Sequence, residues 1–122
     1  MTPRRLADLV HEPLHAGPVD GADLVGDAAG ADRRVVRLGL WLDDLGRVRR
    51  ARHRTTSCAS LIGYAEAACS LAEAGEPLPA IDGDRLAGAV TGAHPLHRDR
   101  AFLVARALER ALLARAPSRE DP

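Results

Sequence analysis

The chain has very few aromatic residues and no lysine. Only one tryptophan, one tyrosine and one phenylalanine occur among its 122 residues. The apolar interior must therefore be built from leucine, valine and alanine, which suits helices packed closely on a small sheet. All 17 basic residues are arginine, and 17 acidic residues balance them. A net charge of zero gives no overall attraction to nucleic acid or to an anionic membrane surface, so we expect neither as a partner.

The chain also lacks a long apolar segment and has only two cysteines, Cys58 and Cys69. No run approaches the ~20 apolar residues that a membrane-spanning helix needs, and no signal-peptide pattern is present. We therefore expect a cytoplasmic protein with no membrane partner. Both cysteines fall on one predicted helix, roughly 16 Å apart at about 1.5 Å per residue, which is too far for a disulfide.

The hydrophobic pattern predicts strands followed by a run of helices. Strands are expected over 22–25, 33–42 and 47–55, with a loop at 26–32 and a turn at 43–46. Helices are expected over 3–10, 58–74, 82–90 and 97–116. This order favours an α+β fold, with a small antiparallel sheet of about three strands covered on one face by helices. We expect a single domain over 1–122, with its core over about 6–116 and a frayed tail at 117–122.

Cys58 has the clearest physical case for reactivity in this sequence. The polar turn Thr55–Ser57 offers N-cap residues, which predicts that Cys58 opens the following helix. The unpaired N–H groups of a first helical turn favour a thiolate, the form that accepts sulfur or binds metal. Cys69 falls in the apolar stripe of the same helix, where we expect a buried, inert thiol.

Five segments follow the order and spacing of the motifs of a known family. They are His11–Gly17, Gly30–Asp32, the hairpin over 33–52, Thr55–Ser60 and Leu96–Arg98. In the family these positions hold an N-terminal loop of the type YxNPRNxG, then Cys-Gly-Asp, a β-hairpin, Thr-x-Gly-Cys-x-(Ser/Ala), and a His-Cys pair. From about Leu6 to Leu113 the chain thus resembles the IscU/NifU N-terminal family, the scaffolds on which iron–sulfur clusters are assembled.

The resemblance implies a cofactor-binding or metal-binding site formed by Cys58, Asp32 and His97. The family's site uses three cysteines, of which only Cys58 is kept; Gly30 and Arg98 occupy the positions of the other two. A [2Fe–2S] cluster takes four ligands, usually thiolates. The cofactor is therefore expected to be such a cluster, a single Fe or Zn ion, or none at all.

As function, the resemblance implies a divergent, non-enzymatic scaffold that accepts sulfur or binds metal around Cys58. Its partner would be a cysteine desulfurase, and the chain would be a monomer or a weak homo-oligomer. The alternative is a pseudo-scaffold, which keeps the fold as a protein-interaction surface and carries out no cluster chemistry. The segment before His97 lacks the lysine of the family's chaperone-binding motif, so ordinary chaperone recognition is not expected.

Other interpretations of single residues stay open at this point. Asp32 could pair with a neighbouring arginine, and His97 could cap the last helix. Arg98 could hold an anion beside Cys58 or simply be solvated. Eight arginines over 33–54 are expected to pair with the acidic N-terminal region or with a protein partner, because no aromatic residues alternate with them for stacking on bases. Two further histidines, His53 and His94, are candidates for a fourth metal ligand.

Overall fold

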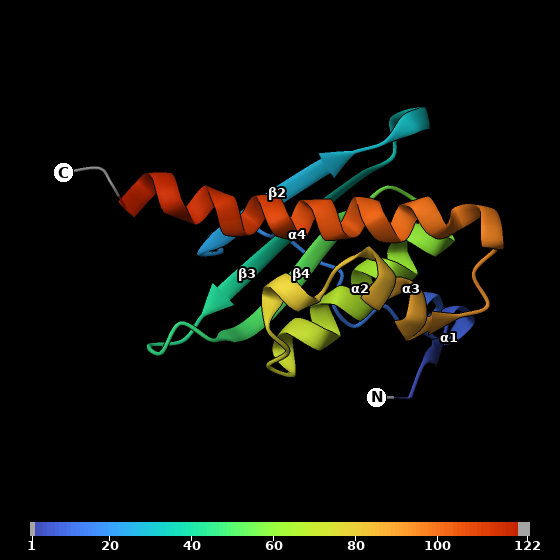
Figure 1. Ribbon diagram of the computed structural model, residues 1–122, viewed down its shortest axis with the longest axis horizontal. Coiled ribbons are helices and arrows are strands. Elements are labelled where there is room, and N and C mark those ends of the chain that lie inside the picture. The colour runs from blue at the N-terminus through green and yellow to red at the C-terminus, as the bar shows by residue number, and fades with distance from the viewer. Residues whose placement is uncertain (1, 120–122) are drawn as a thin grey trace.

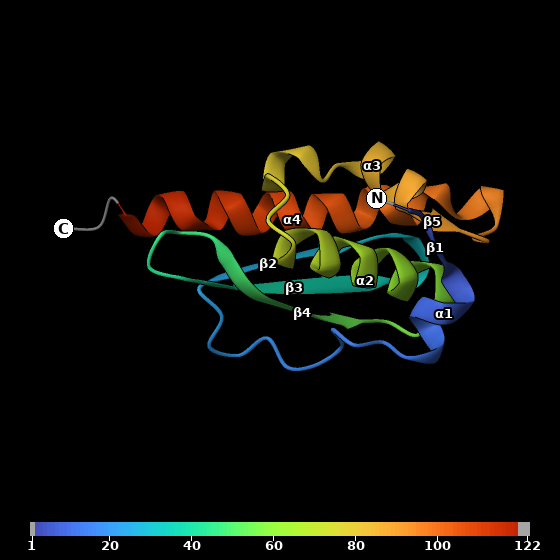
Figure 2. The same cartoon turned by 90° about the horizontal axis from the view of Figure 1, so that it is seen from below.

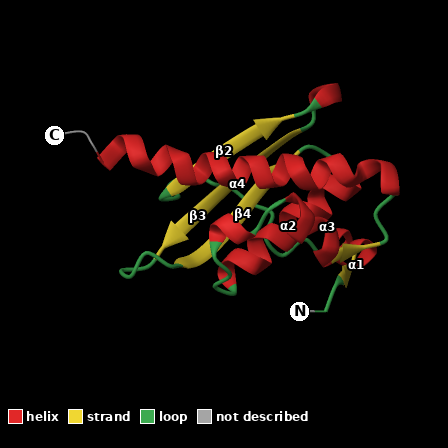
Figure 3. Ribbon diagram, in the orientation of Figure 1, coloured by secondary structure: helices red, strands yellow, loops and turns green. Residues whose placement is uncertain are grey.

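A computed structural model describes the backbone of residues 2–119 and the side chains up to residue 114. It has a mixed α/β architecture whose centre is a three-stranded antiparallel sheet in the order β2–β3–β4. The strands are β2 (Leu24–Ala29), β3 (Val35–Leu42) and β4 (Val48–Thr55). Helices α2 and α4 cover one face of this sheet (Figures 1 and 3). The predicted three-stranded sheet with helices on one face is confirmed.

Four α-helices occur among the described residues: α1 (Leu6–His11), α2 (Ala59–Glu73), α3 (Gly83–Ala89) and α4 (Arg98–Arg119). Short 3-10 turns lie at η1 (Ala31–Arg33), η2 (Leu78–Ala80) and η3 (Pro95–His97). A two-residue parallel ribbon joins β1 (Arg4–Arg5) to β5 (Val90–Thr91). Within the described residues, no helix combines the length and apolar character that a membrane crossing requires.

The core lies between the sheet and the two covering helices, as the side view in Figure 2 shows. On β3 the residues Val36, Leu38 and Leu40 point inward and are almost completely buried. Alanines of α2 and α4 pack opposite them, including Ala65 and Ala107. Short side chains on both helices let the helix backbones approach the sheet closely, which compensates for the scarcity of aromatic residues.

Strand β2 is longer than the sequence predicts. The pattern placed a strand at 22–25 and a loop at 26–32, but the strand continues through Ala29. Gly26 explains the error, because a Cβ atom there would overlap the backbone oxygen of Ala107 and the backbone nitrogen of Ala111. Small residues are typical of loops, but a strand also needs them where the backbone of a helix lies directly on it.

The remaining predicted bounds hold with smaller corrections. Helices α2 and α3 begin and end within one residue of their predicted positions. The first helix begins at Leu6 rather than residue 3, because Arg4 and Arg5 pair with β5. Helix α4 continues to Arg119, so the tail predicted as frayed at 117–122 is helical as far as 119, and the rest of it lies outside the described residues.

Arg37 and Arg50 of the hairpin lie on the outer face of the sheet, opposite to the buried residues of β3. Arg37 pairs with Asp27 across strands at 3.1 Å, in agreement with the predicted ion pairs to the acidic N-terminal region. The guanidinium of Arg50 stacks over the ring of Trp41, 4.9 Å from its centroid. The predicted ion pairing with the acidic N-terminal region is thus supported at Arg37, while Arg50 contacts an aromatic ring instead.

Candidate functional site

Cys58 lies at the N-terminus of α2, at the end where β4 leads into the helix. It is half-buried and has extended backbone angles of φ −148° and ψ 114°. It is itself the N-cap, and no side chain caps this helix. The predicted cap from the polar turn is wrong, because the N-cap position falls on Cys58 itself. In that turn, Thr56 instead joins the end of β4 to β3. Its hydroxyl accepts from the Val35 backbone N–H at 2.8 Å and donates to the Val35 carbonyl at 3.1 Å.

His97 is brought to the start of α2 by a contact with Ser60. The Ser60 hydroxyl and Nδ1 of His97 share a hydrogen bond of 2.8 Å, and Ser60 is buried. Partial burial and the positive charge of Arg100 lower the pKa of His97. The imidazole is therefore neutral near pH 7, and Ser60 fixes the direction in which it points.

Arg100 is the cation that approaches Cys58. Its side chain is only 12% exposed, and Nη1 donates to Asp99 at 2.8 Å. Burial opposes its charge, but the hydrogen bond to Asp99 and the proximity of Cys58 raise the pKa of Arg100. Its Nε atom is buried and has no hydrogen-bond partner in the described part of the chain. A buried guanidinium N–H without an acceptor favours an anion at this place. We refer to Cys58, Ser60, His97 and Arg100 as the thiol site.

Arg98 and Asp32, which the sequence placed beside Cys58, have other partners. Arg98 is exposed and forms an ion pair with Asp84 at 2.6 Å, so its guanidinium is held by a carboxylate of α3. Asp32 lies on the turn η1 with left-handed backbone angles, and its exposed side chain pairs with Arg34 at 3.2 Å. The structure thus places His97 against Ser60, two residues after Cys58, and pairs Asp32 with a neighbouring arginine.

The donor set of this chain does not fit a [2Fe–2S] cluster. Such a cluster takes four ligands, usually thiolates, and the thiol site offers one. The second cysteine, Cys69, is buried in the core, and burial raises its pKa well above the ordinary value. Among the residues that the structure describes, no three histidine, cysteine, aspartate or glutamate side chains are grouped to hold one metal ion. A metal role for Cys58, Asp32 and His97 stays a prediction.

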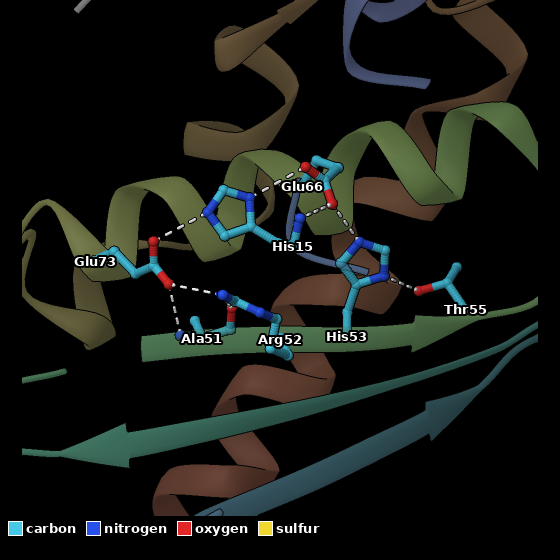
Figure 4. Close-up of polar contacts among 7 residues, drawn as sticks. All are labelled: His15, Ala51, Arg52, His53, Thr55, Glu66 and Glu73. Atoms are coloured by element: carbon cyan, nitrogen blue, oxygen red, sulfur yellow. Dashed lines mark hydrogen bonds and ion pairs between the residues drawn. The ribbon is translucent and has the colours of Figure 1, made fainter. Parts of the chain in front are cut away.

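A second cluster of ionisable groups lies between α2 and β4, and its histidines and Glu66 are buried while Glu73 lies at its more exposed end (Figure 4). His15 contacts two carboxylates of α2: Nδ1 lies 3.1 Å from Glu66 and Nε2 lies 3.0 Å from Glu73. On β4, Nε2 of His53 lies 2.7 Å from Glu66, and Nδ1 lies 2.8 Å from the Thr55 hydroxyl. Glu73 also accepts from the Ala51 backbone N–H and from Arg52. We call these residues the buried network: His15, Arg52, His53, Thr55, Glu66 and Glu73.

The charges of the buried network support one another. The hydrogen bond with Glu66 raises the pKa of His15 against the effect of burial, and Glu73 adds to the rise. Burial alone would raise the pKa of Glu66, but hydrogen bonds from both histidines lower it to about 2. His15 can donate to two carboxylates only when both of its ring nitrogens carry a proton. The network is therefore an ion cluster with an imidazolium at its centre.

The sequence contains one signal for this network. Glu66 is the only charged residue in the interior of an otherwise apolar or small-residue helix, and a carboxylate on such a face needs a buried partner. His53, weighed above as a metal ligand, already uses both ring nitrogens inside the network. His15 gives no local signal, because it belongs to a proline-containing and glycine-containing loop whose course depends on tertiary contacts.

Comparison with known protein families gave no match, and comparison with curated protein sequences gave none either. The candidate function therefore depends on the motifs of the sequence and on the geometry of the two clusters.

Proposed function

We propose that this chain is a divergent relative of the IscU/NifU N-terminal scaffolds and that it accepts sulfur at Cys58. The observation that carries the proposal is the position of Cys58, half-buried at the start of α2 and close enough to Arg100 to raise the pKa of that guanidinium. The ordered motifs and the three-stranded sheet with helices on one face are consistent with that relationship. The partner would be a cysteine desulfurase, and the compartment would be the cytoplasm.

The proposed step is the transfer of one sulfur atom. The Cys58 thiolate attacks the outer sulfur of a persulfide on the donor cysteine. The donor's sulfur–sulfur bond breaks, its cysteine leaves as a thiolate, and a new sulfur–sulfur bond joins the transferred atom to Cys58. No oxidant or reductant is consumed. The transferred sulfur carries a negative charge, which suits a site that presents Arg100 and a neutral His97.

The test is sulfur transfer from a cysteine desulfurase supplied with ³⁵S-labelled cysteine. We expect label on the wild-type chain under non-reducing conditions and on Cys69→Ser, the matched control with a buried thiol. In Cys58→Ser the label should fall by about tenfold or more, because that variant lacks the thiol that forms the persulfide. Absence of label on the wild-type chain, or equal labelling of both variants, would refute sulfur acceptance at Cys58.

The pseudo-scaffold interpretation predicts a different result in the same samples. A chain that only binds a partner would be captured equally well by the desulfurase with or without the Cys58 thiol, and it would carry no label. The loss of two of the family's three cysteines motivates this second candidate. The labelling experiment separates the two functions directly.

Arg100 gives the proposal a sharper prediction. The equilibrium constant for sulfur transfer from glutathione persulfide to Cys58 should fall about tenfold in Arg100→Gln. The variant loses a hydrogen bond to the charged persulfide, and such a bond contributes ~1.5 kcal/mol. The matched control is Arg98→Gln. Arg98 carries the same charge and lies two residues before Arg100, but its side chain pairs with Asp84. Mass spectrometry after alkylation measures the loaded fraction. Equal loading of both variants would contradict the role of Arg100.

A further inference from the structure

Residues 12–19, which we call the strap, lie across the edge of β4 that no other strand of the sheet occupies. A single parallel bridge pairs Ala16 with His53. The His53 backbone N–H donates to the His15 carbonyl at 2.9 Å, and the Gly17 N–H donates to the His53 carbonyl at 3.0 Å. Val19 then packs over Gly39 on the outer face of the sheet. The strap thus passes from the helix-covered face around the edge of β4 to the opposite face.

His15 is the side chain that ties the strap to the body of the protein. It is 8% exposed, and its two ring nitrogens face carboxylates that lie two helical turns apart on α2. Its backbone N–H also donates to Glu66 at 2.9 Å. Three polar contacts from one residue therefore fix the strap against α2, while the edge of β4 is held by two backbone hydrogen bonds.

We propose that the positive charge of His15 acts as a latch that holds the strap on β4, and that loss of its proton releases the strap. A neutral imidazole has one N–H, so one of its nitrogens would present a lone pair to a carboxylate at close range. Glu73 is the carboxylate that can lose this donor, because Ala51 and Arg52 still donate to it. Release uncovers the N–H and carbonyl groups of His53, which are the features of an open strand edge.

The surrounding charges define the pH range in which the strap is closed. The groups that face His15 are Glu66 and Glu73 of α2 and, beyond them, Arg52, His53 and Thr55 of β4 (Figure 4). The pKa of His15 is raised above 6.5, so its contribution is complete below 6.5 and is lost as the pH rises through the raised value. The pKa of Glu66 is lowered from 4.5 to about 2, so its contribution is complete above 4.5 and is lost as the pH falls toward 2.

The experiment is an NMR titration of the wild-type protein between pH 5 and 9. The ring nitrogens of His15 should show an imidazolium at neutral pH and a midpoint above 6.5. Protection from exchange at the Gly17 and His53 amides should fall with that same midpoint, by about tenfold or more relative to the Leu38 amide in the core of the sheet. A midpoint at or below 6.5, or strap amides that stay protected while His15 titrates, would overturn the latch.

Two variants test the latch further while keeping His15 in place. Glu73→Gln takes away one of the two carboxylates that face His15, so both the His15 midpoint and the release of the strap should move to lower pH. Glu76→Gln is the matched control, because Glu76 pairs with Arg85 and not with the network. Equal midpoints in the two variants would also refute the latch. None of these measurements depends on sulfur transfer to Cys58.

Discussion

Replacement of Glu66 by leucine should lower the free energy of unfolding by about 3–5 kcal/mol, the cost of removing one partner from a buried ion pair. Glu66 is 2% exposed and accepts from the His15 ring, the His15 backbone and the His53 ring. Leucine fills the space but leaves a buried imidazolium facing no carboxylate on that side. Urea denaturation followed by circular dichroism at pH 7 measures the change.

Two further variants provide a comparison for the stability loss of Glu66→Leu. Glu66→Gln keeps the size and one acceptor oxygen, so its loss of stability should lie between wild type and Glu66→Leu. Glu76→Leu removes a partly exposed partner of Arg85, where ion pairs contribute ~1 kcal/mol or less. If Glu66→Leu costs no more than Glu76→Leu, the buried network does not stabilise the fold.

The second large effect is expected at Gly26, where alanine should destabilise the protein by about 3 kcal/mol. The added Cβ would overlap backbone atoms of Ala107 and Ala111 on α4. These backbone atoms cannot rotate away as the end of a flexible side chain can. Helix α4 as a whole must therefore move away from the sheet. Thermal and urea unfolding both report the loss.

Gly88 provides the matched control for Gly26. It lies in α3, and a Cβ atom there would meet no atom within 4 Å. Alanine at this position should raise the stability by about 0.5–1 kcal/mol, because it lowers the entropy of the unfolded chain and favours helix. Equal effects of the two substitutions would mean that the close approach of α4 to β2 does not limit residue size.

The sequence predicts the hairpin and the central helix well because both have local signals. Alternation along 35–42 marks β3, and Gly46 with φ 80° supplies the left-handed residue of the turn. Gly75 with φ 91° follows the end of α2 in the same way. Strand β2 has no such signal, because Gly26 is required by contact with Ala107 and Ala111 of α4, which lie more than eighty positions later in the chain.

The sequence predicts where Cys58 lies along the chain, but it does not predict which side chains approach it. Cys58 lies at the start of a helix as expected, because the strand, turn and helix are consecutive. The choice between Arg98 and Arg100 depends on the rotation of α4 about its axis, and residues two apart point about 200° away from each other. Asp32 pairs with Arg34, two residues away, and the sequence alone does not favour Cys58 over this neighbour as its partner. The His15 network depends on contacts across 51 and 58 positions, for which local periodicity gives no information.

The stack of Arg50 on Trp41 has a practical consequence, because Trp41 is the only tryptophan of the chain. Its fluorescence comes from one position near the turn of the hairpin, at the opposite end of β3 and β4 from Cys58. Emission from this indole therefore reports the integrity of the hairpin without an added dye. Chemical modification of the thiol can be followed in the same cuvette, with the intrinsic signal serving as the record of an intact sheet.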